Sequence, residues 1–210
     1  MADVEKIEKL VSEHDACFLV FDSREARWLP TLLAALHNKI CISVGLGFDS
    51  YVIIRHGMSP LVHDPAEDPE RSGCFFCNDY LAPSNTMSDR TLDQQCTVTR
   101  YTSPKLKNNR PGLSYVSSGF AVELLVNLVS HPLRNRAPGY HADEIPTHKG
   151  KPIEISPEAD MGIVPQHIRG SVGYFETKTM QSSAFDYCLA CSKPIVEDFV
   201  KDKRGMITRA

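Results

Sequence analysis

Residues 16–46 read ACFLVFDSREARWLPTLLAALHNKICISVGL, and this stretch contains the pattern that decides the fold. The run ACFLVFD has the length and apolar character of a buried strand and ends in Asp22. Ser23 is a suitable helix cap before REARWLPTLLAALHNK, in which Pro30 either bends the helix or marks its true start. KICISVGLG is a second buried strand. A strand, a helix and a strand within about 30 residues form a βαβ unit, which predicts an α/β fold with a parallel sheet.

Further elements are predicted on both sides of this unit. Residues 3–14 have the apolar spacing of a short amphipathic helix, and SYVIIRHG (50–57) is a candidate third strand. A helix is predicted over SYVSSGFAVELLVNLVS (114–130), where His131 and Pro132 end it. Residues 161–181 suggest short strands. We therefore expect one sheet that continues well beyond the βαβ unit.

Composition and charge indicate an ordinary globular protein. The chain has 210 residues, of which 42% are hydrophobic and 23% are charged. Its net charge of −3 favours neither nucleic acid nor anionic membranes, and we expect no nucleic-acid binding. No apolar stretch reaches the ~20 residues that span a bilayer, so we expect no membrane insertion. Seven cysteines without a secretory signal argue against a disulfide framework and indicate a cytoplasmic location.

Four of the cysteines form two C-x-x-C pairs, CFFC at 74–77 and CLAC at 188–191. Four thiolates can surround one tetrahedral Zn²⁺, and a two-residue spacer lets both sulfurs of a pair turn toward one metal. A thioredoxin-like redox pair is the alternative, but that motif uses one pair after a first strand. We predict a structural zinc that attaches the end of the chain to its middle.

The sequence offers an incomplete nucleotide site. Asp22 ends a predicted strand, and ligands gather at the carboxyl ends of parallel strands, although capping of the next helix explains this aspartate equally well. GLGFDS (45–50) starts like a G-x-G-x-x-G turn but has Ser50 at the third glycine and leads toward a β-rich run. We therefore find no glycine-rich phosphate loop.

A fifth cysteine, Cys96, lies in the polar segment DRTLDQQCTVTR (89–100). Nearby cations favour the reactive thiolate, and Arg90 and Arg100 supply them. Residue types alone do not make Cys96 a nucleophile, because a buried or merely exposed cysteine is commoner.

Five segments carry a family resemblance, in this order: DSREARWLP, GCFFCND, LDQQCTVTR, GIVPQHIRG and CLAC. Together they resemble the C-terminal adenylation domain of the autophagy ubiquitin-like-modifier-activating enzymes. The resemblance implies a Rossmann-like α/β domain with a mainly parallel sheet. It also implies ATP- and Mg²⁺-dependent adenylation of a modifier's C-terminal glycine, a thioester on the enzyme, and transfer to a conjugating enzyme.

The resemblance assigns roles to individual residues. Cys96 matches the thioester cysteine, and Arg100 could stabilise developing charge beside it. Asp22 and Arg27 match the Asp-x-x-x-x-Arg motif near ATP and Mg²⁺. The family's zinc ligands correspond to Cys74, Cys77, Cys188 and Cys191. The implied partners are ubiquitin-like autophagy modifiers, their conjugating enzymes and a second copy of the chain, with autophagosome assembly sites as one place of action.

The chain also departs from the family pattern. Residues 101–110 (YTSPKLKNNR) separate Arg100 from a Pro-Gly pair that follows directly in the family, so Arg100 or Arg110 could take the arginine's role. The family's phosphate-binding turn has no counterpart here, which suggests an incomplete copy that is inactive alone. The alternatives are a non-catalytic, zinc-stabilised binding or dimerisation module and a thiol redox protein.

These expectations divide the partial adenylation domain, residues 1–210, into four parts. Residues 1–57 are the βαβ part. Residues 58–131 hold the first zinc knuckle, the catalytic-cysteine loop and a helix. Residues 132–160 form a variable insert, and 161–210 carry the second zinc knuckle.

Overall fold

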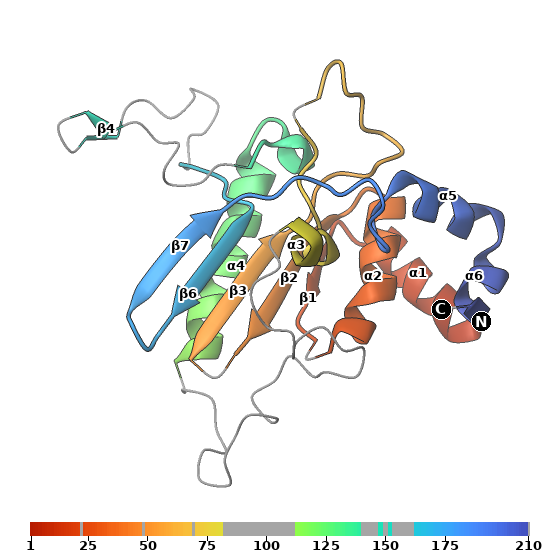
Figure 1. Cartoon of the computed structure of the whole chain (residues 1–210), viewed down its shortest axis with the longest axis horizontal. Coiled ribbons are helices and arrows are strands. Elements are labelled where there is room, and N and C mark those ends of the chain that lie inside the picture. Colours follow the sequence, from red (N-terminus) through yellow and green to blue (C-terminus); the bar gives the residue numbers. More distant parts are fainter. Residues whose placement is uncertain are drawn as a thin grey trace, which may run out of the picture.

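The computed structural model describes residues 1–21, 23–47, 49–68, 70–81, 112–139, 147–148, 151–152 and 162–209. Its helices and strands alternate from α1 to β2, and β3 then follows β2 directly (Figure 1). In chain order the elements are α1 (Ala2–Glu13), β1 (Ala16–Leu19), α2 (Arg24–Leu36), β2 (Ile40–Leu46), β3 (Ser50–Arg55), α3 (Phe75–Leu81), α4 (Leu113–Ser130), the 3₁₀ helix η2 (Arg134–Arg136), β4 (Thr147–His148), β5 (Lys151–Pro152), β6 (His167–Ser171), β7 (Glu176–Met180), α5 (Lys193–Lys201) and α6 (Lys203–Arg209).

The main sheet has the strand order β1-β2-β3-β6-β7. β1 pairs with β2 in parallel, with Cys17 opposite Cys41, so the βαβ unit and the α/β class are confirmed. The expected mainly parallel arrangement is wrong for the rest of the described sheet, where β2–β3, β3–β6 and β6–β7 are all antiparallel. The connections at residues 47–49 and 172–175 are too short for a crossover, so β2–β3 and β6–β7 form hairpins.

Local signals explain how α2 begins. The Ser23 side chain accepts a hydrogen bond from the backbone N–H of Ala26 at 3.4 Å, as an N-cap residue does. Pro30 lies inside α2, so it does not mark the start of the helix. Its missing N–H costs one backbone hydrogen bond, and the burial of the helix against the sheet offsets this loss.

The alternation of side chains along the strands creates two different layers. On one face, Ile42, Val44, Tyr51 and Ile53 pack with α4. On the other face, Ile54 packs in a cluster that joins α1, α2, α5 and α6 with the four paired cysteines. Figure 1 shows α4 across one face of the sheet and α2 beside β1. The paired cysteines therefore lie on the α2 face.

Helix α4 is more apolar than a surface helix. Its buried residues are Leu113, Ser117, Ala121, Leu124 and Leu128. Among the described residues it is the one helix that is long and apolar enough to cross a membrane, judged by length and composition alone. The sequence alone predicts no such stretch. It contacts β2 and β3 on one side, and 28% of its residues are buried.

The segment after α4 is packed against the sheet. Arg55, which is 1% exposed, donates a hydrogen bond from Nη2 to the carbonyl oxygen of Ala137 at 2.7 Å. Burial lowers the pKa of Arg55 to about 10, so the side chain stays charged at neutral pH. The start of the expected insert is therefore fixed to β3.

Candidate metal centre and nucleotide-end residues

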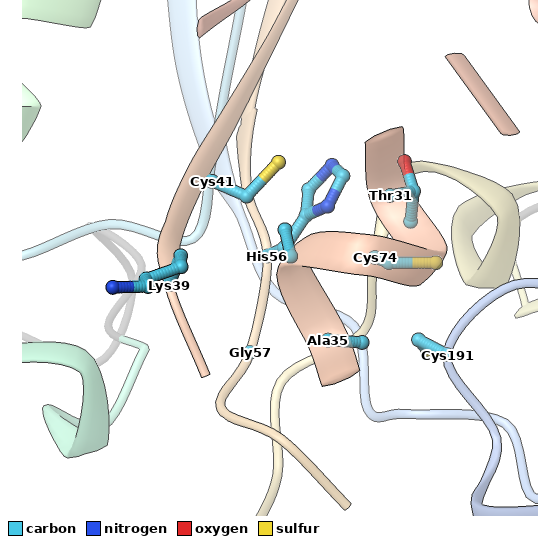
Figure 2. Close-up of a pocket in the computed structure, with 9 residues that line it drawn as sticks. Thr31, Ala35, Lys39, Cys41, His56, Gly57, Cys74 and Cys191 are labelled. Atoms are coloured by element: carbon cyan, nitrogen blue, oxygen red, sulfur yellow. The ribbon is translucent and has the colours of Figure 1, made fainter. Parts of the chain in front are cut away.

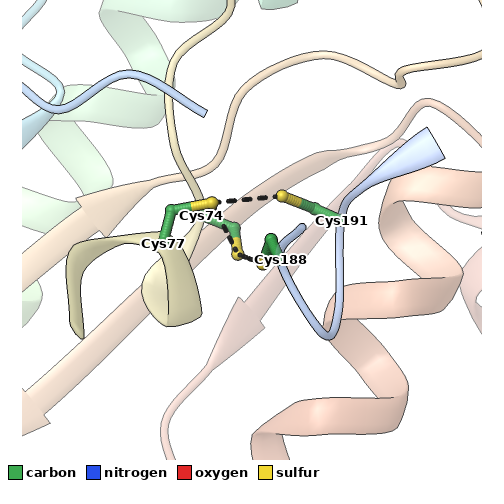
Figure 3. Close-up of side chains that lie close together, drawn as sticks. All are labelled: Cys74, Cys77, Cys188 and Cys191. Carbon is green, nitrogen blue, oxygen red and sulfur yellow. Dashed lines mark hydrogen bonds between the residues drawn. The ribbon is translucent and has the colours of Figure 1, made fainter. Parts of the chain in front are cut away.

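The two C-x-x-C pairs meet at one point although residues 78–187 separate them in the sequence (Figure 3). Cys74 and Cys77 lie at the start of α3, and one helical turn brings their sulfurs together. Cys188 and Cys191 lie in the turn before α5. All four side chains are at most 3% exposed, and their sulfur atoms lie within 4.8 Å of one another.

The sulfur spacing fits a tetrahedral metal site. With metal–sulfur bonds of 2.3 Å, tetrahedral geometry places neighbouring sulfurs about 3.8 Å apart. The Sγ–Sγ distances are 3.8 Å for Cys74–Cys77, 3.6 Å for Cys74–Cys188 and 3.4 Å for Cys77–Cys191. The four side chains can therefore hold one zinc-like ion with little movement.

Hydrogen bonds favour thiolates at two of the four positions. The neighbouring sulfurs of Cys188 and Cys191 lower the pKa of Cys77, and the backbone N–H of Phe185, which donates to the Cys77 sulfur from 3.3 Å, adds to this effect. The pKa of Cys188 is lowered as well, chiefly by the Cys191 thiol. The Ala190 N–H also donates to the Cys188 sulfur, at 3.5 Å. Such N–H donors orient metal-ligating sulfurs.

Burial separates this cluster from redox dithiols. A reactive C-x-x-C cysteine has to be accessible to a thiol or disulfide partner. Here Cys77 and Cys188 are 0% exposed and Cys74 is 1% exposed. The arrangement favours a closed structural metal site over the thioredoxin-like alternative.

A small cavity borders the cluster, but it is not a nucleotide site (Figure 2). Its volume is about 10 Å³, room for about one water molecule. It is lined by Thr31, Ala34, Ala35, Lys39, Cys41, His56, Gly57, Cys74 and Cys191.

Arg27 lies at the carboxyl ends of β1 and β2, where nucleotide ligands are expected. Its guanidinium donates to the carbonyl oxygens of Leu19 and Val44, at 2.7 Å each, and to that of Phe21. It also stacks on the ring of Phe75, with 4.9 Å from Cζ to the ring centre. The side chain is 1% exposed, so it links the two strand ends to the first cysteine pair.

Four predicted or alternative site residues lie outside the described residues, namely Asp22, Cys96, Arg100 and Arg110. The structure describes the chain up to Leu81 at the end of α3 and again from Gly112 before α4. The roles of Cys96 and Arg100 therefore stay predictions.

The sequence reasoning missed a set of buried polar residues beside the cysteines. His56 is 4% exposed, and its Nε2 lies 2.9 Å from Ser43 Oγ. His167 is 1% exposed, and Gln166 is fully buried. The sequence does contain a signal for these residues, because they lie directly beside apolar strand segments. Polar residues at such positions are buried and need hydrogen-bond partners.

Comparisons with known proteins place this arrangement in a family. The ThiF family model matches residues 1–162, which is well over half of the chain. The chain belongs to the ThiF family. The match includes the βαβ unit, the first cysteine pair and α4, whereas the second cysteine pair lies beyond it.

Curated relatives match the chain nearly from end to end. A protein of Gibberella zeae named ubiquitin-like modifier-activating enzyme ATG7 is 41% identical over 99% of this chain. Proteins of the same name from Dictyostelium discoideum and Komagataella pastoris are 38% and 40% identical over 93% and 95% of it. The chain spans only 26–28% of the length of these three relatives.

Proposed function

We propose that this chain takes part in activating ubiquitin-like autophagy modifiers. The observation that carries the proposal is an identity of about 40% to three ATG7 proteins over nearly the whole chain. The name of these relatives describes modifier activation. The four-cysteine cluster adds support, because the resemblance implied a zinc site at these residues.

The proposed reaction has three chemical steps. The carboxylate of the modifier's C-terminal glycine attacks the α-phosphorus of ATP, and pyrophosphate leaves. The Cys96 thiolate then attacks the acyl carbon, and AMP leaves with the electrons of the broken C–O bond. The thioester passes to the cysteine of a conjugating enzyme. Asp22 is proposed to help hold Mg²⁺ with ATP, and Arg100 or Arg110 to stabilise charge near Cys96.

We assign Arg27 a supporting part in this reaction. Its guanidinium is bonded to three backbone carbonyls at the ends of β1 and β2. These bonds fix the edge of the sheet at which the nucleotide is expected to bind. Arg27 thus positions the site and connects it to the zinc-binding segment through Phe75.

We also propose one structural zinc per chain on the four paired cysteines. Their burial leaves no open coordination position for water, so the ion stabilises the fold and does not take part in the reaction. It would hold the segment before α5 against the start of α3.

A second proposal is that two copies of the chain associate through α4. The helix has one charged residue, Glu123, and exposes Tyr115, Val122 and Val126, among others, on its outer side. Such a surface is typical of an interface. The alternative function is a dimerisation module without catalysis. If α4 is the interface, Val122→Glu should weaken the association of two copies in sedimentation without changing the fold.

We propose that the protein acts in the cytoplasm, including autophagosome assembly sites.

ATP–pyrophosphate exchange tests the proposed activity. We expect no exchange by the 210-residue chain alone, because its sequence contains no glycine-rich phosphate loop. We expect exchange when the preceding part of an ATG7 relative is supplied as a separate chain. A non-reducing gel with the modifier should then show a thioester that Cys96→Ala abolishes and Cys17→Ala leaves intact. Thioester formation that survives Cys96→Ala would overturn the assignment of the nucleophile.

A further inference from the structure

The two cysteine pairs are joined by backbone before any metal is considered. The Gly73 N–H donates to the Ser182 carbonyl at 2.8 Å, and the Ala184 N–H donates to the Arg71 carbonyl at 2.7 Å. Ser72 and Ser183 form an isolated antiparallel bridge between these bonds. Each segment leads directly toward one pair, the first to Cys74 and the second to Cys188.

Close packing at Gly73 shows how tightly these segments approach. A Cβ atom added at Gly73 would lie 2.8 Å from the carbonyl oxygen of Ser183 and 2.9 Å from the Cβ of Cys77. Real Cβ atoms do not occupy such positions. The residue before the first cysteine must therefore be glycine for the two segments to meet.

The side chain of Gln166 bridges the same two segments. Its Nε2 donates to the Gly73 carbonyl oxygen at 2.7 Å, and its Oε1 accepts from the Ser182 N–H. A carbonyl needs a donor and an N–H needs an acceptor, so these partners fix the orientation of the amide. Gln166 is fully buried, and both polar ends of its side chain are satisfied.

The backbone of Gln166 is attached to the sheet. Its carbonyl oxygen accepts a hydrogen bond from the Arg55 N–H at 2.9 Å, and the next residue, His167, begins β6 opposite Ile54. One residue thus connects the core sheet with the segments that carry both cysteine pairs. Gln166 lies in the motif GIVPQHIRG (162–170), to which the proposed reaction gives no role.

We propose that Gln166 is the positioning residue of the four-cysteine centre. It holds the two pairs at ligating distance and thereby slows the release of the bound metal. This inference rests on the proposed zinc site. Groups that fix the ligands of a metal from outside its coordination shell typically change metal affinity about 10–100-fold.

The rate of zinc release to an excess of a colorimetric chelator tests this role in the full chain. Gln166→Met keeps the side-chain volume and removes both hydrogen bonds, so release should become about 10–100-fold faster. Gln181→Met is the matched control, because Gln181 is exposed and directly precedes Ser182. It should release zinc at the unaltered rate. Cobalt(II) substitution gives a second readout, since altered thiolate absorption bands would report changed ligand geometry.

Gln166→Glu separates positioning from general destabilisation. This side chain still accepts from Ser182, but as a carboxylate it repels the Gly73 carbonyl oxygen. Burial raises the pKa of such a carboxyl group, so it regains a donor as the pH falls. The ratio of its release rate to that of the unaltered chain should therefore shrink between pH 8 and pH 6. It also replaces Gln166→Met if that variant does not fold.

The outcomes distinguish this inference from the zinc proposal. An unaltered chain without zinc overturns the proposed metal site and this role together. An unaltered chain with zinc, and equal release rates in Gln166→Met, Gln166→Glu and Gln181→Met, overturns only the role of Gln166. A release ratio for Gln166→Glu that does not change with pH also contradicts the proposed bond to Gly73.

Discussion

The face of the sheet under α4 and the face under α2 are attached to their helices by different interactions. Under α4 the buried contacts are mainly those of apolar side chains from β2, β3 and β6. Under α2 the core also contains four cysteines, two histidines and a guanidinium, held by specific hydrogen bonds. Apolar contacts tolerate small shifts, whereas ligand and hydrogen-bond geometry does not. Side-chain positions therefore have to be more accurate on the α2 face, beside the proposed site, than on the α4 face.

The largest effect should come from breaking the metal centre. Cys74→Ser removes one of four proposed ligands, and structural zinc sites contribute on the order of 10 kcal/mol to folding. We expect the variant to lose its zinc and its cooperative thermal unfolding. Cys17→Ser is the control, because Cys17 lies outside the cluster and should change the free energy of unfolding by about 1 kcal/mol. Equal stability of the two variants, measured by calorimetry, would contradict a role for the metal in stabilising the fold.

A cavity under α4 should cost less and should leave the metal unaffected. Leu128 is fully buried, so Leu128→Ala should lower the free energy of unfolding by about 2–5 kcal/mol. Val126→Ala changes an exposed residue of the same helix and should cost about 0.5 kcal/mol or less. Zinc content should stay the same in both variants. Zinc loss in folded Leu128→Ala would show that the two faces are coupled.

Arg27→Ala should weaken the edge of the sheet between the two layers. The substitution leaves backbone carbonyls at β1 and β2 without their charged donor, which should lower the free energy of unfolding by about 3 kcal/mol. Arg24 provides a matched control, since it also stacks on a phenylalanine of the CFFC motif, at 5.8 Å from Phe76. Arg24→Ala should cost about 1 kcal/mol. Similar losses in urea unfolding would mean that ring stacking, not carbonyl binding, is the role of Arg27.

The effect expected to be smallest at neutral pH is that of His56, and it grows as the pH falls. Burial lowers the pKa of His56 to about 3, from 6.5 in its ordinary state. The unfolded chain therefore binds a proton that the folded chain does not, and stability falls as the pH drops from 6.5 toward 3. The slope is about 1.4 kcal/mol per pH unit for each such histidine. Compared with the unaltered chain, His56→Asn should flatten the pH dependence of the free energy of unfolding, and His14→Asn, at an exposed position, should not.

The sequence was sufficient where a local pattern determines the structure. Apolar runs and the Ser23 cap located β1, α2 and β2, and the C-x-x-C spacing identified all four clustered cysteines. The expectation of a mainly parallel sheet fails at β3, which pairs antiparallel with β2 across a short hairpin connection. The role of Gln166 could not be predicted, because its side chain binds the backbone of Gly73 and Ser182. These residues are distant in the sequence, so no local pattern indicates the contacts.

The metal content of the unaltered chain tests the central claim most directly. The protein is purified in reducing buffer, its zinc is measured by elemental analysis, and its thiols are titrated with the fold intact. The account predicts one zinc per chain, with Cys74, Cys77, Cys188 and Cys191 protected from the thiol reagent until a chelator is added. A folded chain without metal, in which these four cysteines react freely, would contradict it.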